Sequence, residues 1–402
     1  MTPQAGPDIG VREAAGSPVL PAPPPLALYV HIPWCIKKCP YCDFNSHQLD
    51  PAADAAGQQA RYVDALLADL QASLPLVWGR PVVSVFMGGG TPSLFEPAQI
   101  ERLIAGIRAM LPLQPGCEIT LEANPGTFER QRFAAFADAG ITRLSVGVQS
   151  FNDAALQRLG RVHSAGQARA ALQEAARVFA TFNLDLMYAL PGQTLAQLQA
   201  DVQEALAFNP PHLSIYQLTI EPNTVFAKYP PRLPADDVAW AMLDAITAAT
   251  GQAGLQRYEV SAYARPGHHC VHNLNYWQFG DYLGIGAGAH GKLSLACGII
   301  RQQRYMLPAS YMRHALAGNA VSRQHDVTAV DLPFEYMLNA LRLKGGFSLH
   351  DFAARTGLPV QAVEAQIYEA SRNGWLERRG HRVQPTARGF DFLNDVQALF
   401  LP

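Results

Sequence analysis

The sequence has no excess of charge of either sign. Its 31 Lys and Arg residues face 33 Asp and Glu residues, which gives a formal net charge of -2. A chain this balanced has no global field that favours nucleic acid or an anionic membrane. It also lacks any apolar run close to the ~18 residues that a transmembrane helix needs. Residues 1–25 contain several prolines but no basic segment followed by an apolar one, so they predict a disordered tail and no secretory signal. We therefore predict a cytoplasmic protein with no nucleic-acid partner.

Cysteine is scarce, and its placement is uneven. Three of the six cysteines, Cys35, Cys39 and Cys42, fall within eight positions. A disulfide framework is typical of short secreted chains, and a structural zinc site normally has four N/S ligands, often in two close pairs. Three thiolates from one loop can instead bind three irons of a [4Fe-4S] cluster, whose fourth ligand is usually another cysteine. An iron without a protein ligand is open to a small molecule. The other cysteines are distant: Cys117, Cys270 and Cys297.

Residues 26–265 alternate between short apolar runs and stretches of helical periodicity. Apolar residues recur at helical spacing between the runs, as at Leu195, Leu198, Val202 and Leu206. About six strand–helix repeats predict a parallel sheet with helices outside it, because parallel strands need crossovers. Periodicity alone does not decide whether the sheet closes. The predicted strands are Leu26–His31, Val82–Met87, Glu118–Leu121, Arg143–Val148, Leu184–Tyr188 and Leu213–Leu218.

Polar residues and glycines follow these strands at the ends where parallel strands gather ligands. Gly88–Thr91 follows the second strand, and its free N–H and C=O groups could bind an amino acid head group, unless it is an ordinary tight turn. Glu122 could accept hydrogen bonds from both hydroxyls of a ribose, or form a cap or ion pair. Gln149 ends the fourth strand. Asp185 lies in an apolar strand and needs a partner; Arg161 could be that partner or could bind a ligand carboxylate.

The segment 266–330 is rich in histidine, aromatic residues and glycine. Histidine is a frequent ligand of haem iron, and Tyr and Trp offer flat apolar faces to a porphyrin. The alternative is that these side chains only pack one end of the sheet. The glycine run Gly284–Gly288 lacks the spacing of a dinucleotide fingerprint, so we assign it no such role.

Residues 331–402 predict a small α-rich, winged-helix-like unit. Winged-helix DNA readers concentrate positive charge, whereas this unit has eight Lys and Arg residues and eight Asp and Glu residues. A protein-contact or lid role is therefore the better interpretation. The expected elements are helices near 333–343, 348–356 and 359–373, a hairpin or wing at Leu376–Thr386, and a last helix that ends at Phe400.

The spacing Cys35-xxx-Cys39-xx-Cys42, with Tyr41 before the last cysteine, resembles the signature of the radical S-adenosylmethionine (SAM) superfamily. The stretch Tyr29-Val-His-Ile-Pro-Trp resembles one branch, which contains oxygen-independent coproporphyrinogen III oxidases and haem chaperones. The resemblance covers nearly everything after residue 25. It implies a partial (β/α)6 barrel, the C-terminal domain of that branch, and a [4Fe-4S] cluster whose open iron is chelated by SAM. In that superfamily the cluster's electron cleaves SAM to a 5′-deoxyadenosyl radical.

The resemblance also implies two sets of binding residues. His272-Asn-Leu-Asn-Tyr-Trp277 matches the HNxxYW motif associated with haem binding in the chaperones of this branch, and His268, His269 and His290 are rival iron ligands. A thioether to Cys270 is not expected, because Cys-x-His is not the covalent c-type haem motif. The implied haem residues are His272, Asn273, Tyr276 and Trp277, and the implied SAM residues are Tyr29, Tyr41, Gly89, Gly90, Thr91, Glu122, Gln149, Arg161 and Asp185.

Three functions follow from the resemblance: a haem chaperone, an oxygen-independent coproporphyrinogen III oxidase, or another radical SAM tetrapyrrole enzyme. The oxidases resemble Cys-xxx-Cys-xx-Cys-x-Cys, whereas Phe44 stands at the last of these positions. The oxidases also carry a longer structured segment before the position of Tyr29. Both departures favour a chaperone that binds haem and passes it to proteins such as respiratory cytochromes, so decarboxylation of coproporphyrinogen is not expected. The acceptor, the mode of haem attachment, productive SAM cleavage, peripheral membrane contact and a homodimer stay open.

Overall fold

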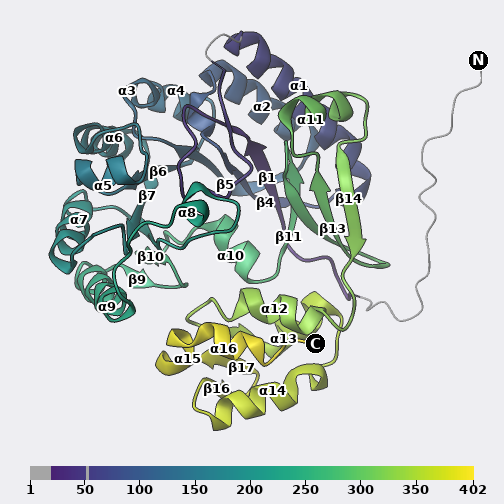
Figure 1. Cartoon of the computed structure of the whole chain (residues 1–402). Helices are drawn as coiled ribbons and strands as arrows, with labels where there is room; N and C mark the ends of the chain where they lie inside the picture. Colours follow the sequence, from purple (N-terminus) through teal and green to yellow (C-terminus); the bar gives the residue numbers. More distant parts are fainter. Residues whose placement is uncertain (1–19, 51–53) are drawn as a thin grey trace, which may run out of the picture.

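The computed structural model describes residues 20–50 and 54–402 (Figure 1). Most of the expected tail, residues 1–19, lies outside this range. The part that is described contacts the fold. Leu20 packs against the C-terminal core, and the carbonyl of Pro24 accepts a hydrogen bond from Arg80 Nη2 at 2.6 Å. No helix among the described residues is long and apolar enough to cross a bilayer.

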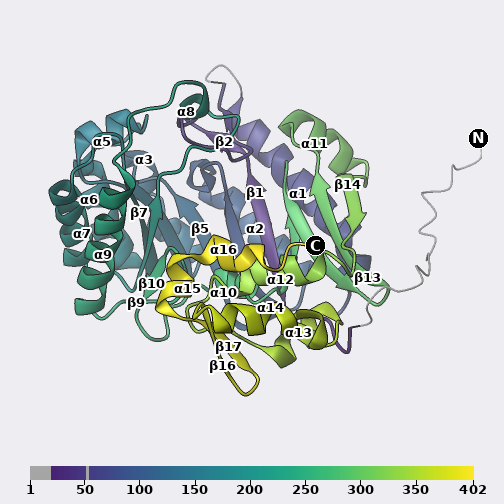
Figure 2. The same ribbon diagram turned by 60° about the horizontal axis from the view of Figure 1, so that its bottom comes forward.

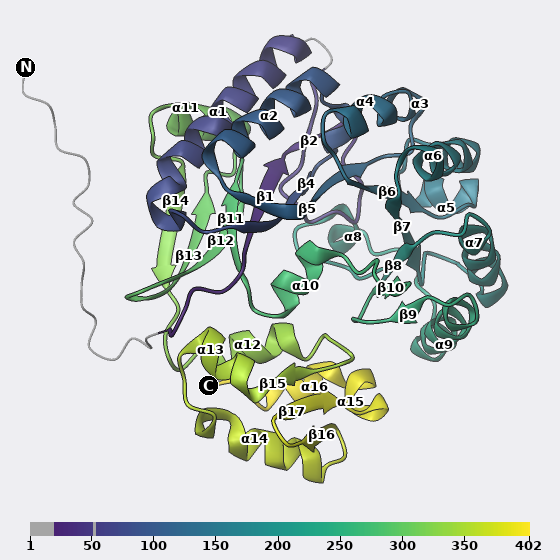
Figure 3. The same cartoon turned by 180° about the vertical axis from the view of Figure 1, so that it is seen from behind.

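A single twelve-stranded sheet organises the chain, in the order β14-β13-β12-β11-β1-β4-β5-β6-β7-β8-β10-β9 (Figures 1 and 3). Its central strands are parallel, and each overlaps one of the runs predicted from the sequence, so the predicted parallel sheet is confirmed. The sheet stays open because β1 pairs with β11 on its free side and β8 pairs with β10. The central strands are β1 (Leu26–Ile32), β4 (Val82–Gly89), β5 (Leu113–Ala123), β6 (Arg143–Gln149), β7 (Thr181–Tyr188) and β8 (His212–Gln217).

Helices cover the convex side of these strands, and the alternation along each strand explains why. Leu184 and Leu186 of β7 are fully buried in the main hydrophobic core, whereas Asn183 and Asp185 between them bond to other polar groups inside the barrel. The barrel therefore has an apolar outside and a polar inside. The helices in chain order are α1 (Ala55–Val77), α2 (Pro97–Met110), α3 (Thr127–Arg130), α4 (Phe133–Asp138), α5 (Asp153–Arg158), α6 (Ala165–Val178), α7 (Leu195–Ala207), α8 (Val225–Lys228) and α9 (Asp236–Gln252).

The segment 266–330 extends the sheet beyond β1, first with one parallel strand and then with an antiparallel meander. β11 is parallel to β1, and β12, β13 and β14 follow as antiparallel neighbours. A buried ion pair between Asp69 of α1 and Arg304 of β13, at 3.1 Å, ties this extension to the helical layer. The elements around it are β9 (Gln256–Arg257), β10 (Ala262–Ala264), α10 (Val271–Trp277), β11 (Asp281–Ile285), β12 (His290–Leu295), β13 (Gly298–Arg304), α11 (Pro308–Leu316) and β14 (Val321–Asp326).

The C-terminal unit has its own hydrophobic core and lies against α10 at one end of the barrel (Figures 1 and 2). Its hairpin forms as expected, but the single last helix does not. Phe392, at φ -105° and ψ 39°, leaves the helical region and divides that helix in two. The elements are α12 (Leu332–Ala340), β15 (Phe347–Ser348), α13 (Leu349–Thr356), α14 (Gln361–Arg372), β16 (Leu376–Arg379), β17 (Arg382–Pro385), α15 (Ala387–Asp391) and α16 (Leu393–Ala398).

Candidate functional site

The three clustered cysteines lie in the loop that follows β1, at the carboxyl ends of the parallel strands. Short strands β2 (Trp34–Cys35) and β3 (His47–Gln48) pair in parallel and close the base of this loop. Cys35, Cys39 and Cys42 all line one cavity of about 370 Å³. The structure therefore brings together the residues that the sequence spacing selects.

Each of the three sulfur atoms has at least one polar side chain beside it. Burial raises the pKa of the Cys35 and Cys42 thiols, so a thiolate at either position needs a compensating positive charge such as iron. Hydrogen bonds to ligand sulfurs also tune the potential of iron–sulfur clusters. Sequence analysis missed Ser46 in this role. The contacts are Thr91 Oγ1 to Cys35 Sγ (3.6 Å), Arg161 Nη1 to Cys39 Sγ (3.8 Å) and Ser46 Oγ to Cys42 Sγ (3.7 Å).

The arrangement of the three cysteines bears on the kind of metal centre that they could hold. Among the described residues, no three His, Cys, Asp or Glu side chains converge closely enough to hold one metal ion. A tetrahedral zinc needs such convergence, with each sulfur about 2.3 Å from one centre. Ligands of a cubane cluster each bind a different iron, so they share a cavity without meeting at a point. The three cysteines share one cavity, which is the arrangement that the ligands of a multi-iron cluster need.

The same cavity contains all but one of the residues implied for SAM. Tyr29 is the exception. Its ring stacks on Phe86 at 6.3 Å, and its hydroxyl donates to His31 Nδ1 at 2.9 Å, so it lies deeper in the barrel. The cavity is lined by Tyr41, Gly89, Gly90, Thr91, Glu122, Gln149, Arg161 and Asp185.

The glycine turn after β4 is a close contact between strands. Gly89 has φ +109°, and a Cβ atom there would come within 2.4 Å of the His31 ring. The N–H of Gly89 donates to Glu122 Oε2 at 3.1 Å, the N–H of Gly90 donates to the carbonyl of Ile32 at the end of β1, and the N–H of Thr91 donates to the carbonyl of Trp34 in β2. The expectation that these N–H groups are free to bind a ligand is therefore wrong. Two backbone carbonyls and the Glu122 carboxylate already accept hydrogen bonds from them.

Four carboxyl groups line the cavity, those of Asp43, Glu122, Asp185 and Glu221. Burial and the nearby charge of Asp185 raise the pKa of Glu122 to about 7, and the Gly89 N–H partly offsets this. Burial also raises the pKa of Asp185. Asp185 accepts hydrogen bonds from Asn183 Nδ2 at 2.7 Å and Ser145 Oγ at 3.2 Å. These neutral donors bond to Asp185 directly, whereas the Arg161 charge lowers its pKa without a hydrogen bond.

Arg161 belongs to the cysteine side of the cavity. Its Nη2 donates to Asn124 Oδ1 at 2.6 Å and to the Gly147 carbonyl at 2.7 Å, while its Nη1 lies near Cys39. Asn124 in turn donates to Thr91 Oγ1 at 2.9 Å, a contact that no local pattern in the sequence indicates. Gln149 completes the wall with φ +70°, a left-handed backbone that only a tightly constrained strand end supports.

The haem-motif residues lie apart from this cavity, on α10 at the other end of the barrel. The His272 ring stacks on Phe86 at 4.7 Å, and burial lowers its pKa to about 4, so the imidazole is neutral. Its Nδ1 is buried with no hydrogen-bond partner among the described residues. Tyr276 packs on Tyr282 at 5.0 Å, and the Arg342 guanidinium covers Trp277 at 4.3 Å. Asn273 lies half-buried on the same helix.

The rival histidines have partners of their own. His268 Nδ1 lies 3.2 Å from Thr181 Oγ1, and the ring of His269 packs on Tyr258 at 4.4 Å. His290 begins β12 and is exposed. Of these histidines, His272 is the one whose ring nitrogen is buried without a partner in the described part of the chain.

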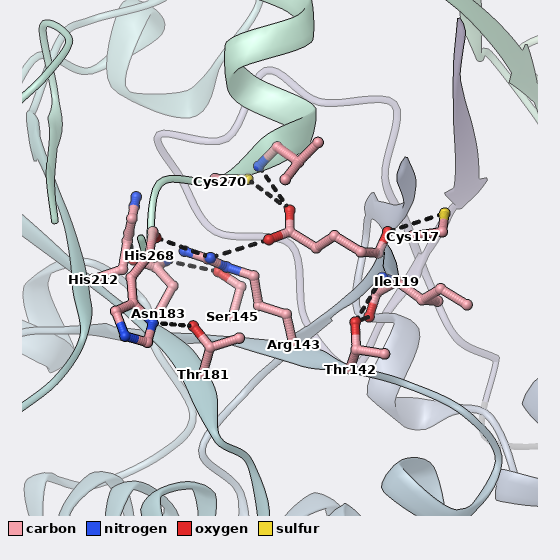
Figure 4. A network of polar contacts seen from close by, with 12 residues as sticks. Cys117, Ile119, Thr142, Arg143, Ser145, Thr181, Asn183, His212, His268 and Cys270 are labelled. Atoms are coloured by element: carbon pink, nitrogen blue, oxygen red, sulfur yellow. Dashed lines mark hydrogen bonds and ion pairs between the residues drawn. The ribbon is translucent and has the colours of Figure 1, made fainter. Parts of the chain in front are cut away.

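A polar network fixes the start of α10 at the amino ends of the strands (Figure 4). Glu118 Oε2 and Arg143 Nη1 form a buried ion pair at 3.2 Å. Glu118 Oε1 also accepts the Val271 N–H at 2.9 Å, and Arg143 Nη1 donates to the His268 carbonyl at 3.2 Å. Sequence analysis treated Glu118 and Arg143 only as strand residues. Charged residues at inward-facing positions of β5 and β6 need a buried partner, and that need could have identified the pair from the sequence.

Comparisons with known proteins agree on the family. Residues 29–205 match the model of the radical SAM superfamily, and residues 327–392 match the HemN C-terminal domain. The chain is 46% identical over 383 residues to the heme chaperone HemW of Escherichia coli (strain K12), covering 94% of this chain and 98% of that protein. It is 36% identical over 372 residues to the heme chaperone HemW of Mycobacterium tuberculosis (strain ATCC 25618 / H37Rv), covering 91% and 92%.

A solved structure supports the fold over nearly the whole chain. Coproporphyrinogen III oxidase (HemN) from Escherichia coli, a radical SAM enzyme, superposes with a TM-score of 0.79. The match covers 94% of this chain and 90% of that chain, at 24% identity. An identity this low establishes a shared fold and not a shared reaction.

Proposed function

The chain belongs to the HemW family of the radical SAM superfamily, and from that premise we propose that it is a haem chaperone, which binds haem and passes it to haem-accepting proteins. The observation that carries this proposal is the 46% identity to a named heme chaperone over 94% of the chain. The presence of the full His272–Trp277 motif adds to it. We place the protein in the cytoplasm, where respiratory cytochromes or their precursors are candidate acceptors.

The cysteine loop would hold a [4Fe-4S] cluster, which supplies one electron and an open iron for SAM. Cys35, Cys39 and Cys42 bind three irons, and the polar neighbours of their sulfurs stabilise the thiolates. Glu122 accepts hydrogen bonds from the ribose hydroxyls, because it lines the cavity and its carboxylate accepts the Gly89 N–H through one oxygen, Oε2, which leaves further acceptor capacity. Tyr41, Gln149 and Asp185 enclose the remaining surface of the ligand.

His272 is the proposed haem-iron ligand. A neutral imidazole with an unpartnered nitrogen has the required chemistry. In this conformation, however, its ring is stacked on Phe86 and the C-terminal unit covers Trp277. Haem therefore reaches His272 only when α10 moves away from the barrel and from that unit. Such a movement would couple haem loading to the contact between the two units.

The oxidase alternative depends on the shared fold alone. The oxidases have a further cysteine two residues after the last cysteine of the loop. Phe44 stands at that position here, and its side chain is 59% exposed beside the cavity. An exposed aromatic side chain contributes no ligand to a cluster. We therefore do not favour oxidative decarboxylation of coproporphyrinogen III.

The deciding experiment gives the anaerobically reconstituted protein either haem or coproporphyrinogen III. We expect about one haem per chain, transfer of that haem to an apo-cytochrome, and no protoporphyrinogen even with SAM and an electron donor. His272→Ala should shift the Soret band and weaken haem binding without changing the iron–sulfur spectrum. His325→Ala, on the exposed strand β14, is the control. Robust decarboxylation with haem binding indifferent to His272 would reverse the choice of function.

A further inference from the structure

The glycine run Gly284–Gly288 has no role in the proposed haem or SAM sites, yet it touches the cysteine loop. Asn45, three residues after the last clustered cysteine, donates its two amide N–H bonds to the carbonyls of Ala287 and Met306, both at 2.8 Å. The backbone carbonyl of Asn45 accepts a third bond, from His31 Nε2 at 2.9 Å. One side chain thus joins the cysteine loop to two turns that lie far away in sequence.

Glycine is required on the receiving side of this contact. At Gly288, with φ +77°, a Cβ atom would come within 2.4 Å of Asn45 Nδ2. At Gly286, with φ +108°, a Cβ atom would come within 2.3 Å of the His31 carbonyl oxygen. Both positions combine a left-handed backbone with a close approach, so any other residue would push Asn45 or β1 away.

The turn Gly286–Gly288 is itself held rigidly from beneath. The N–H of Gly286 donates to the Tyr311 hydroxyl at 3.0 Å, and that hydroxyl donates to Asp69 Oδ2 at 2.9 Å. The N–H of Ala287 donates to the Tyr62 hydroxyl at 2.8 Å, which donates to the His31 carbonyl at 2.7 Å. Tyr62, Asp69 and Tyr311 are fully or almost fully buried, so the turn cannot shift without breaking this network.

The His31 ring carries the support into the barrel. A backbone carbonyl can only accept, so Nε2 must hold the proton that bonds to Asn45. Nδ1 is then the acceptor for the Tyr29 hydroxyl at 2.9 Å. Tyr29 is therefore not a wall of the SAM cavity but one end of a chain that leads through His31 to the cysteine loop.

We propose that Asn45 and the Gly286–Gly288 turn form a clamp, supported by His31, that positions the cysteine loop so that the iron without a protein ligand faces the SAM cavity. This inference rests on the cluster of the proposed function. Asn45 is a positioning residue, because it contacts none of the three cysteine sulfurs in the described contacts. Removing a residue that orients the ligands of a metal site typically lowers metal affinity about 10–100-fold.

Asn45→Ala tests the clamp, with Asn339→Ala as the matched control. Like Asn45, Asn339 donates from Nδ2 to the backbone, here to one carbonyl, that of Glu335 at 2.7 Å. It lies in the C-terminal unit, away from the cysteine loop. After anaerobic reconstitution, Asn45→Ala should lose iron to a chelator about 10–100-fold faster than wild type. The change in the EPR spectrum of the reduced cluster on adding SAM should also be diminished. Asn339→Ala should behave as wild type in both measurements.

Gly288→Ala and Asn45→Asp give independent variants, and circular dichroism verifies that each is folded. Folded variants that fail to assemble any cluster support the clamp as firmly as rapid iron loss does. Wild-type iron retention and an unchanged SAM response in Asn45→Ala would overturn it, and so would an equal loss in Asn339→Ala. Absence of a cluster from the wild-type protein would instead overturn the proposed function.

Discussion

The two ends of the barrel treat buried charge in opposite ways. At the amino ends of the strands, Glu118 is paired with Arg143 and also bonds to the backbone at the start of α10. At the carboxyl ends, Glu122 and Asp185 face one cavity, and neither forms an ion pair with any described residue. Burial of an unpaired carboxylate is costly, and the raised pKa of both groups reflects that cost. The first end is completed by an ion pair within the chain, whereas at the second end Glu122 and Asp185 have no such partner among the described residues.

We call the carboxyl ends of the strands the open end of the barrel and the amino ends the closed end. The strongest effect should come from removing a thiol at the open end. Cys39→Ser should abolish the broad visible absorption and the bound iron after anaerobic reconstitution, because the cluster loses one of three protein ligands. Cys297→Ser, an exposed cysteine far from the cavity, should retain both. Full iron content in Cys39→Ser would remove this cysteine from the ligand set.

The closed end should respond in stability and not in cofactor binding. Arg143→Met leaves Glu118 buried without its cation, which typically costs 3–5 kcal/mol of unfolding free energy. Urea denaturation of the apo protein measures this loss. The cluster spectrum of the folded variant should be that of wild type. A loss below about 1 kcal/mol would mean that this ion pair behaves like an exposed one.

A carboxylate at the open end should affect cofactor binding and not stability. Glu122→Gln should weaken SAM binding by about 1–3 kcal/mol, since a charged acceptor is replaced by a neutral amide. Calorimetry on the cluster-loaded protein gives the affinity, and the cluster spectrum should not change. Glu101→Gln, on the exposed side of α2, is the control. Equal affinities for both variants would contradict the ribose assignment.

The pH dependence of SAM binding gives a smaller but more specific effect. With a pKa of about 7, Glu122 is mostly ionised at pH 8 and mostly protonated at pH 6. Its capacity to accept two hydrogen bonds is therefore lost as pH falls, and SAM affinity should fall about tenfold over this interval. Glu122→Gln should have a flatter profile. A wild-type profile as flat as that of the variant would place the titration elsewhere.

The sequence was informative where the signal is local. Cysteine spacing selected the loop that lines the cavity, and alternating apolar runs located the parallel strands, because both patterns act within a few residues. The C-terminal hairpin followed from the same kind of pattern. The interruption at Phe392 did not, since nothing in the periodicity distinguishes one helix from two short ones.

Long-range contacts were not accessible in this way. No pattern near Tyr29 indicates that its hydroxyl bonds to His31 and not to a ligand. No pattern near Gly88–Thr91 indicates that the carbonyls of Ile32 and Trp34 and the carboxylate of Glu122 already accept hydrogen bonds from three of its N–H groups. The glycine run Gly284–Gly288 was assigned no function because its spacing matches no cofactor motif. Glycine is needed there because Asn45, far away in the chain, packs against this turn and bonds to it.

The parallel pairing of β11 with β1 sets an order of events during synthesis. A ribosome adds about 5–20 residues per second, so on the order of tens of seconds separate the emergence of these two strands. Throughout that interval the cysteines are outside the ribosome, but the turn that holds Asn45 has not been made. We expect iron to be retained only after translation is nearly finished. Nascent chains stalled before residue 281 should then release iron that chains stalled well beyond α11 keep.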